Sequence, residues 1–308
     1  MAMTRDIVSV TKLTKRFGNF PAVNGISFSV TEGEIVGLLG PNGAGKTTTL
    51  AMMLGVIAPS SGDINVFGKN FATHREEILK DMNYSSAYVK SPWRMTVWEH
   101  VYVFALMYEV ANPRQKTEEM LSTFHLTKLR NTLGGDLSSG NSARLNLAKA
   151  FVNQPKLVLL DEPTSSVDPD IADRIRQFIK LSREKYQTTI LLTSHNMAEI
   201  EELCDRVIFM DHGKIVAVDT PEGLAKKIKK TRVRLMMRDG QKRTVEYCAT
   251  RHLTCQTNER YVMIDINEQQ VASLLTDLSK IGADYTQISI DKPTLEDFFI
   301  GKARHETA

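Results

Sequence analysis

The sequence predicts an α/β fold built around a parallel sheet, and three observations support this prediction. Short, almost continuously apolar runs at "EIVGLLG", "KLVLLDEP" and "TTILLTSH" are typical of strands that are covered on both faces. Stretches with helical spacing of apolar residues lie between such runs, at 97–110, 114–126 and 142–153. Strands that alternate with helices form βαβ units, in which the strands run parallel within one sheet.

The first thirty residues alternate in the manner of exposed strands. In "VNGISFSV" the apolar residues fall largely on one side of an extended chain, with Ser27 and Ser29 on the other. Further along, "RVIFMDHGKIVAVD" predicts a hairpin with a His-Gly turn. We therefore expect an antiparallel β subdomain at the N-terminus, next to the parallel sheet.

The pattern of charged and apolar residues changes after about residue 225. We predict a first domain over 4–225, with a helical subdomain at about 90–150, and a small α+β domain over 226–308. In the second domain, "RVRLMMR" and "KRTVEY" predict two strands joined by a hairpin turn at Asp239-Gly240. The runs "YVMIDI" and "YTQISI" predict two more strands, with a helix at "EQQVASLLTDLSKI" between them.

Composition and charge narrow the possible classes of protein. The 308 residues are 42% hydrophobic and 24% charged, which is ordinary for a globular chain with a real core. A net charge of +3 argues against a polyanion binder, and we expect no nucleic-acid partner. The cysteines Cys204, Cys248 and Cys255 form neither an even set nor a CxxC pair, which favours reduced thiols. With no apolar run near the roughly 18 residues that span a bilayer, membrane contact is expected only through a partner.

A glycine-rich stretch between a predicted strand and a predicted helix carries the clearest chemistry. The phosphate-binding motif G-x-x-x-x-G-K-[ST] is met by Gly40, Gly45, Lys46 and Thr47, in the strand–loop–helix context that it requires. Glycines let backbone N–H groups approach phosphate oxygens, and the helix N-terminus adds positive potential. We expect Lys46 to hold the β- and γ-phosphates and the Thr47 hydroxyl to bind Mg²⁺. The predicted nucleotide-binding residues of this stretch are Gly40, Pro41, Asn42, Gly43, Ala44, Gly45, Lys46 and Thr47.

Two acidic residues end the apolar run "LVLLDEP", at the carboxyl end of a predicted strand. In an open α/β sheet this end of the strands faces the ligand crevice. Asp161 is a candidate to support Mg²⁺, and Glu162 is a candidate to polarise the attacking water. Acidic pairs at solvated strand ends are common by themselves, but the phosphate loop favours the catalytic interpretation.

The phosphate loop, "LSSGNSARL", "LLDEPTSSVD" and a strand followed by His195 together resemble the ATPase cassette of ABC transporters, over roughly residues 4–225. The resemblance implies a P-loop NTPase cassette that binds ATP and Mg²⁺. It implies that Thr48 contacts the α-phosphate and that His195 contacts the γ-phosphate and couples it to Glu162. It also implies that Phe17 stacks on adenine, for which a core position is the alternative.

In this family two cassettes face each other, so the resemblance implies a homodimer or a paired cassette. Ser138 and Gly140 match residues that reach the γ-phosphate of the nucleotide held by the opposite subunit, and Asp168 matches an aspartate that faces that subunit. Ser139, which we include in the site, replaces a glycine, and Asn141 replaces a glutamine. A serine is tolerated there if φ is negative, whereas a positive φ would cost about 1–3 kcal/mol.

A third departure from the family lies in "MNYSSAYVKSPWRMTVWEH", where Ala87 stands in place of a glutamine. The glutamine's polar contact must then come from Ser85, Ser86 or a water molecule. Loss of one such contact costs roughly tenfold to a thousandfold in the rate of hydrolysis. The same segment is rich in aromatic residues, which indicates either a buried face or a surface for a helix of the membrane permease. We favour permease docking near Tyr88 and Trp93.

The resemblance implies a subunit that hydrolyses ATP to drive a separate integral membrane permease from the cytoplasmic face of the cell membrane. The tail "KPTLEDFF" resembles the ending of cassettes that serve exporters of the ABC-2 type. One alternative is a soluble ABC-type ATPase that acts on ribosomes or DNA, although members of those groups generally carry two cassettes or long coiled coils. Another is a nucleotide-gated regulatory module with little turnover, which would follow from Ala87 and Ser139. The basic run at 226–234 fits a solvated linker or a membrane-facing segment.

Overall fold

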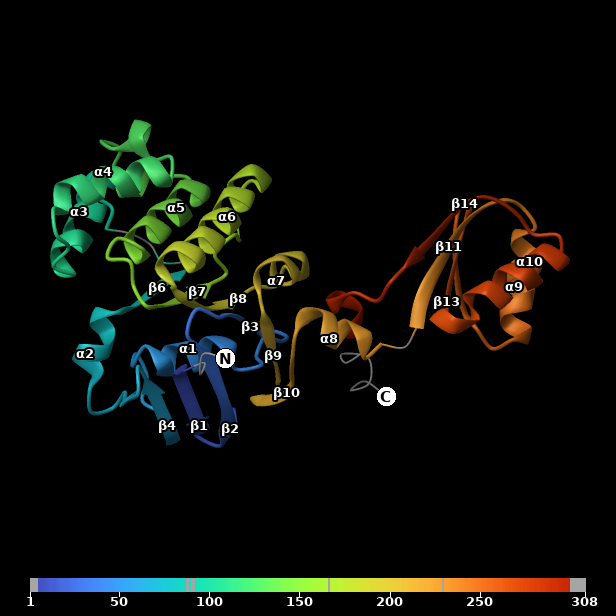
Figure 1. Ribbon diagram of the computed structural model, residues 1–308, viewed down its shortest axis with the longest axis horizontal. Helices are drawn as coiled ribbons and strands as arrows, with labels where there is room; N and C mark the ends of the chain where they lie inside the picture. Colours follow the sequence, from blue (N-terminus) through green and yellow to red (C-terminus); the bar gives the residue numbers. More distant parts are fainter. Residues whose placement is uncertain (1–4, 87–88, 90–91, 166, 229, 300–308) are drawn as a thin grey trace. The chain divides into compact units, whose positions relative to one another are not determined.

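The chain forms two units in the computed structural model, Met1–Thr220 and Pro221–Ala308, and each is described by itself (Figure 1). The structure describes residues 5–86, 89, 92–165, 167–228 and 230–299. Across these residues, no helix is both long and apolar enough to cross a bilayer. Helix α8 (Pro221–Lys226) lies within the second unit, so this division precedes the boundary expected from the sequence by a few residues.

A six-stranded sheet in the order β10-β9-β3-β8-β7-β6 forms the centre of the first unit. Its strands are β3 (Ile35–Leu39), β6 (Met82–Ser86), β7 (Leu157–Asp161), β8 (Thr189–Thr193), β9 (Arg206–Asp211) and β10 (Lys214–Asp219). Neighbouring strands run parallel except β10, which forms an antiparallel hairpin with β9. The predicted parallel sheet is confirmed, and so is the hairpin, whose turn residues His212 and Gly213 both have positive φ.

A second, antiparallel sheet confirms the strand pattern of the N-terminal residues. Its order is β2-β1-β4-β5. The strands are β1 (Asp6–Phe17), β2 (Phe20–Thr31), β4 (Ser61–Val66) and β5 (Lys69–Asn70). Side chains such as Leu13 and Val23 from this sheet share one core with Leu38 of β3 and with Leu50 and Met53 of α1 (Lys46–Met53). This core holds α1, and therefore the loop that precedes it, against both sheets.

Helices α3 (Val97–Met107), α4 (Pro113–Thr123) and α5 (Ser139–Ala150) pack against one another (Figure 1). Helix α5 also contacts β6, which connects this group of helices to the central sheet. The three predicted helical stretches are confirmed to within a few residues at each end. The unit also contains α2 (Arg75–Lys80), α6 (Pro169–Tyr186) and α7 (Met197–Leu203).

The second unit contains an antiparallel sheet in the order β12-β13-β11-β14. Its further elements are β11 (Lys230–Asp239), α9 (Gln241–Thr250), β12 (Thr254–Asn258), β13 (Tyr261–Asn267), α10 (Val271–Lys280) and β14 (Asp284–Asp291). Cys248 of α9 and Leu274 and Leu278 of α10 share a core with Val233 and Leu235 of β11. The two helices therefore cover one face of this sheet.

The strand predicted at "KRTVEY" is wrong, because these residues belong to helix α9. Gly240 has a φ of +83° and is the residue that precedes the first turn of the helix, so it is not part of a two-residue hairpin. An Asp-Gly pair indicates a residue with positive φ, which a hairpin turn and a helix boundary accept equally well. Thr244 and Cys248, four residues apart, are both buried. This helical spacing distinguishes the helix from the strand.

Lys149, on α5, provides a test of how burial affects stability. The side chain is buried, and burial lowers the pKa of its ammonium group to about 8, from 10.5 for an exposed lysine. The folded chain favours the neutral lysine. The cost of charging it therefore grows as the pH falls from 10.5 and is fully present below about 8. We expect Lys149→Met to raise the free energy of unfolding at pH 7 by on the order of 1–3 kcal/mol.

The increase in the free energy of unfolding from Lys149→Met should become smaller as the pH rises toward 10.5, because the lysine is then increasingly neutral in the unfolded chain as well. Urea unfolding of both proteins at pH 7 and near pH 10 measures the two differences. An equal gain at both values would show that burial of the charge is not its cause.

Candidate functional site

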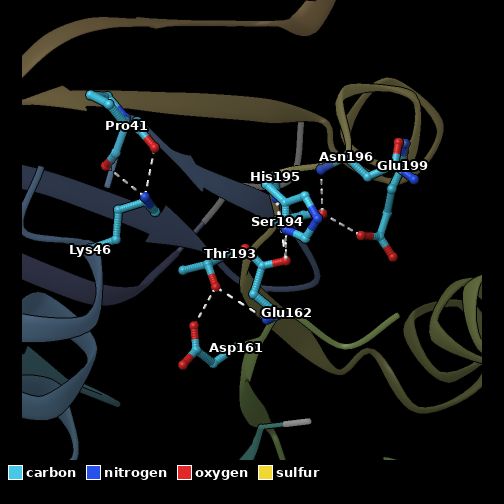
Figure 2. Close-up of polar contacts among 10 residues, drawn as sticks. Pro41, Lys46, Asp161, Glu162, Thr193, Ser194, His195, Asn196 and Glu199 are labelled. Atoms are coloured by element: carbon cyan, nitrogen blue, oxygen red, sulfur yellow. Dashed lines mark hydrogen bonds and ion pairs between the residues drawn. The ribbon is translucent and has the colours of Figure 1, made fainter. Parts of the chain in front are cut away.

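The carboxyl ends of β3, β7 and β8 lie at one edge of the central sheet, and the predicted site residues gather there (Figure 2). The backbone register places Leu38, Thr193 and Asp161 in one row across β3, β8 and β7. The glycine-rich loop follows β3, Glu162 follows β7, and His195 comes soon after β8. The parallel sheet thus brings together groups that are far apart in the sequence.

Glycine is required at two positions of the loop between β3 and α1. Gly40 has a φ of +150°, and a Cβ atom there would lie 2.1 Å from the carbonyl oxygen of Met210. Gly45 has a φ of +99°, and its Cβ atom would lie 2.5 Å from the carbonyl oxygen of Ala22. Neighbouring backbone therefore packs directly against the loop backbone, with no room for side chains on that side. Pro41, Asn42 and Gly43 are exposed, and Ala44 is buried.

Lys46 is the first residue of α1, and its ammonium group turns back toward the loop. Its Nζ donates hydrogen bonds to the carbonyl oxygens of Gly40 at 2.6 Å and of Pro41 at 3.0 Å (Figure 2). Burial lowers the pKa of Lys46, while the carboxylates of Glu162 and Asp161 act in the opposite direction. The ammonium group is therefore already held at the loop, where phosphate oxygens could replace these carbonyl acceptors.

Two hydroxyl groups hold the carboxylate of Asp161. The Oγ1 of Thr193 donates to Oδ1 at 2.6 Å, and the hydroxyl of Tyr84 donates to Oδ2 at 3.4 Å. Burial is the main cause of a raised pKa for Tyr84, so this hydroxyl stays protonated and remains a donor. Sequence reasoning missed both Thr193 and Tyr84 as site residues. Their contacts depend on which strands are neighbours in the sheet, and the order of elements along the chain does not specify that.

Glu162 and His195 form a directly hydrogen-bonded pair. The Nδ1 of His195 lies 2.6 Å from Oε2 of Glu162 (Figure 2). The side chain of His195 is 75% exposed and that of Glu162 is 16% exposed, so the carboxylate lies deeper than the ring. A proton on Nδ1 makes this contact a hydrogen bond to the carboxylate and leaves Nε2 at the exposed side of the ring.

The backbone of Glu162 is strained. Its φ is +54°, and its N–H group donates to the carbonyl oxygen of Thr193 at 3.1 Å. A non-glycine residue in this conformation costs on the order of 1–3 kcal/mol, and such residues gather at functional sites. This conformation directs the Glu162 side chain toward His195 instead of continuing the line of β7.

A buried carboxyl group, Glu199, supports the turn between β8 and α7. The hydroxyl of Ser194 donates to Oε2 of Glu199 at 2.5 Å and accepts a hydrogen bond from the N–H of Asn196 at 3.1 Å (Figure 2). Burial is the main cause that raises the pKa of Glu199. These contacts fix the turn that carries His195. Sequence reasoning missed Glu199, although Asn196 followed three residues later by a glutamate is a helix-start signal.

Thr47 and Asp161 supply the oxygen donors expected for a magnesium site. The hydroxyl of Thr47 lies in the exposed first turn of α1, beside the half-buried Thr48. Within the described residues, no group of three or more His, Cys, Asp or Glu side chains forms a metal-binding cluster. A cation held by Thr47 and Asp161 would have oxygen ligands from the protein, with the rest from phosphate and water. This donor set fits Mg²⁺, which usually keeps several waters and binds through one or two protein groups and substrate phosphates.

The stretch "LSSGNSARL" forms the start of α5. Ser138 is the N-cap, and its Oγ accepts a hydrogen bond from the N–H of Asn141 at 3.3 Å. Ser139 is the first helical residue and is not among those with positive φ, so the strain considered from the sequence is absent. The Oδ1 of Asn141 accepts a hydrogen bond from Arg144, which also donates to the carbonyl oxygen of His125 at 3.2 Å. The variant residues thus form a regular helix start.

Apart from Phe17, the predicted site residues fall into two groups within the chain. Lys46, Asp161, Glu162 and His195 lie at the edge of the central sheet (Figure 2). Residues 138–140 lie at the start of α5, and Asp168 is the residue that precedes α6. The second group is carried by helix N-termini, which attract anions.

Phe17 lies at the end of β1, opposite Phe20 in the neighbouring strand. The side chain is 52% exposed, so the alternative that it belongs to the core is wrong. The Nζ of Lys15 lies 5.2 Å from the centre of the ring. An exposed ring beside a cation can stack on a purine base.

Ala87 and Tyr88 lie outside the described residues. Ser85 and Ser86, the candidates to replace the missing glutamine, are both buried, and Ser86 is in register with Asp161. Trp93 is 65% exposed, so the interpretation of a buried face does not hold for this residue.

Comparisons with known proteins show which family the chain resembles. The family described as ABC transporter matches residues 23–165. The bacitracin transport ATP-binding protein BcrA of Bacillus licheniformis is 31% identical over 301 residues, which are 96% of this chain and 96% of that protein. A fluoroquinolones export ATP-binding protein of Mycobacterium tuberculosis is 37% identical over 237 residues, which are 76% of this chain and 77% of that protein.

Solved structures show the same fold. An ATP-binding subunit of an ABC transporter has a TM-score of 0.67 at 24% identity, with 72% of this chain and 92% of that chain covered. A dimeric ATP-binding cassette in a post-hydrolysis state, bound to ADP and Pi, has a TM-score of 0.63 at 23% identity, with 69% and 98% covered. The P-loop α/β fold predicted for the first domain is confirmed.

The loop geometry predicts that two glycine substitutions differ sharply. Gly40→Ala places a methyl group 2.1 Å from a backbone oxygen, whereas Gly43→Ala, also at positive φ (+83°), meets nothing within 4 Å. Both variants carry backbone strain of about 1 kcal/mol, but only the first forces the loop and β9 apart. We expect thermal unfolding to show a clearly larger loss of Tm for Gly40→Ala. Equal losses would mean that backbone strain alone sets the requirement for glycine.

Proposed function

Because the chain belongs to the ABC transporter family of ATP-binding proteins, we propose that it is the ATP-hydrolysing subunit of an exporter. The observation that carries this proposal is the glycine loop with Lys46 at the same sheet edge as the Glu162–His195 pair (Figure 2). Curated relatives are named for transport of bacitracin and for export of fluoroquinolones, Nod factor and lipopolysaccharide, which supports the outward direction. Since those cargoes differ, none of them is assigned here.

The bound nucleotide is ATP with Mg²⁺. Lys46 exchanges its carbonyl acceptors for oxygens of the β- and γ-phosphates, and the backbone of residues 40–45 surrounds them. Thr48 contacts the α-phosphate, and Phe17 stacks on adenine. Thr47 and Asp161 hold Mg²⁺, which neutralises charge on the β- and γ-phosphates when bound.

Glu162 positions and polarises the water that attacks the γ-phosphate. Its hydrogen bond to His195 and its fixed backbone restrict the direction of the carboxylate, which phosphoryl transfer requires because positioning supplies much of the catalysis. His195 is exposed enough to reach the γ-phosphate from the same side.

Two copies of the chain close around two nucleotides. Ser138, Ser139 and Gly140 at the start of α5, together with Asp168, face the nucleotide held by the partner copy. The helical backbone of Ser139 supports a working turn and weakens the case for a regulatory module without turnover.

The membrane-spanning part of the transporter is a separate integral permease that docks near Tyr88 and Trp93. The exposed Trp93 ring, with the guanidinium of Arg94 4.4 Å from its centre, is a suitable anchor for a helix of that partner. The chain then works at the cytoplasmic face of the cell membrane. The tail "KPTLEDFF" and the small C-terminal α+β domain favour an exporter of the ABC-2 type.

Glu162→Gln tests the hydrolytic role. An amide keeps the shape of the side chain but accepts protons poorly, so we expect ATP binding to persist while turnover falls by about 100-fold or more. Retained ATP should also hold the dimer closed, which light scattering after size-exclusion chromatography detects. Lys46→Ala is the control, with loss of both ATP binding and the dimer. Unchanged turnover in Glu162→Gln would rule out Glu162 as the group that activates water.

Trp93→Ala tests the docking surface. We expect detergent-solubilised membranes to yield less of the co-purifying membrane subunit with this variant than with the unaltered chain, because the anchor is lost. Trp98→Ala is the matched control: Trp98 stacks on Tyr102 and donates to Glu118 at 2.7 Å, so it serves contacts within the chain. Equal recovery with all three proteins would place the docking surface elsewhere.

A further inference from the structure

One buried asparagine connects α5 to the end of β6. Asn146 is 3% exposed, and its Nδ2 donates to the carbonyl oxygen of Ser86 at 3.0 Å and to that of Val89 at 2.9 Å. Both hydrogens of the amide are therefore used on backbone acceptors. These acceptors come from the last residue of β6 and from a residue shortly after it.

Ser86 in turn belongs to a row of residues that crosses the sheet to the nucleotide site. Its register partner is Asp161, whose register partner is Thr193. Thr193 is in register with Leu38 of β3, the strand that leads into the phosphate loop. On the other side, Asn146 lies on the same helix as Ser138, about two turns from its N-terminus. The hydrogen bond from Asn146 to Ser86 therefore connects this row to α5.

A second buried asparagine joins the same two elements at the opposite end. The Nδ2 of Asn83, near the start of β6, donates to the carbonyl oxygen of Ala150 and to Oδ1 of Asn153, both at 2.6 Å. Its contacts are therefore with the C-terminal end of α5 and with the residues that follow it. Asn83 ties the helix to the strand as Asn146 does, but far from the carboxyl end of β6.

We propose that Asn146 is a positioning residue for ATP hydrolysis, which holds the start of α5 in register with the carboxyl end of β6. This inference rests on the proposed function, because it requires that the start of α5 acts on the partner's nucleotide. The position of Ser86 is set by its register with Asp161. The hydrogen bond from Asn146 then fixes α5, and with it the N-cap residue Ser138, relative to Ser86. The contacts that carry the link are the two hydrogen bonds from the Asn146 amide to backbone carbonyls.

Loss of the amide removes this donor from the carbonyl oxygens of the buried Ser86 and of Val89, and lets α5 shift relative to β6. A misplacement of about 1 Å at a catalytic group can cost on the order of 100-fold in rate. The nucleotide held by a single copy should be unaffected, since α1 and its loop pack in a core to which α5 contributes no residue. The effect should therefore appear in kcat and not in the affinity of one copy for ATP.

The experiment compares Asn146→Ala, Asn146→Ser and Asn83→Ala with the unaltered full-length chain. Titration with a fluorescent ATP analogue gives nucleotide affinity, steady-state phosphate release gives kcat and KM, and thermal unfolding gives Tm. We expect Asn146→Ala to lower kcat by roughly tenfold or more, while ATP affinity stays within about twofold. Asn146→Ser, which retains one donor, should lie between. Asn83→Ala should lose a similar amount of Tm and keep kcat within about twofold.

Two results would overturn the inference. One is that both asparagine positions lower kcat in proportion to their loss of Tm, which would make Asn146 merely structural. The other is that Asn146→Ala and Asn146→Ser turn over ATP at the rate of the unaltered chain. If Asn146→Ala does not fold, the comparison of Asn146→Ser with Asn83→Ala decides by the same criterion. Failure of the unaltered chain to bind or hydrolyse ATP would instead refute the proposed function.

Discussion

The site depends on the backbone register between β3, β8, β7 and β6. Hydrogen bonds between these parallel strands place Leu38, Thr193, Asp161 and Ser86 in one row, and buried apolar side chains hold the strands from both faces. A slip of one residue would turn every side chain of a strand to the opposite face and would remove Asp161 or Thr193 from this row. The chemistry at the sheet edge therefore depends on how the strands pack inside the sheet.

The groups at this edge are already held by hydrogen bonds within the chain. Lys46 donates to loop carbonyls, Asp161 accepts from Thr193, and Glu162 is paired with His195. When phosphate binds, these groups therefore need to exchange hydrogen-bond partners but not to search for a conformation. Such preorganisation lowers the entropy lost on binding and the reorganisation needed during the reaction. The strained backbone of Glu162 shows that the fold sustains a local cost to keep this arrangement.

The sequence predicts those parts of the site that local patterns encode. The glycine loop and the Asp161-Glu162 pair could be found because each sits next to an apolar run that predicts a buried strand. Thr193 and Asn146 could not be found, since their roles depend on which strand or helix lies beside them. The same limit explains α9, where Asp239-Gly240 indicates only a positive φ and the burial of Cys248 decides between helix and strand. Long-range neighbours, not local propensity, carry the missing information.

The departures from the family pattern follow one physical rule. Ser139 falls where the backbone is helical, so a side chain is accepted without strain. Asn141 is too short to reach as far as a glutamine, but its oxygen accepts from Arg144, which is itself held by the carbonyl oxygen of His125. At the carboxyl end of β6, backbone carbonyls accept hydrogen bonds from Asn146 of α5. In each case a contact is made by backbone or by a neighbouring side chain. A substitution that removes a side-chain contact is compatible with a working site where other contacts hold the backbone in position. In α5, the Ser138 cap holds the start of the helix, and Asn146 holds it against β6.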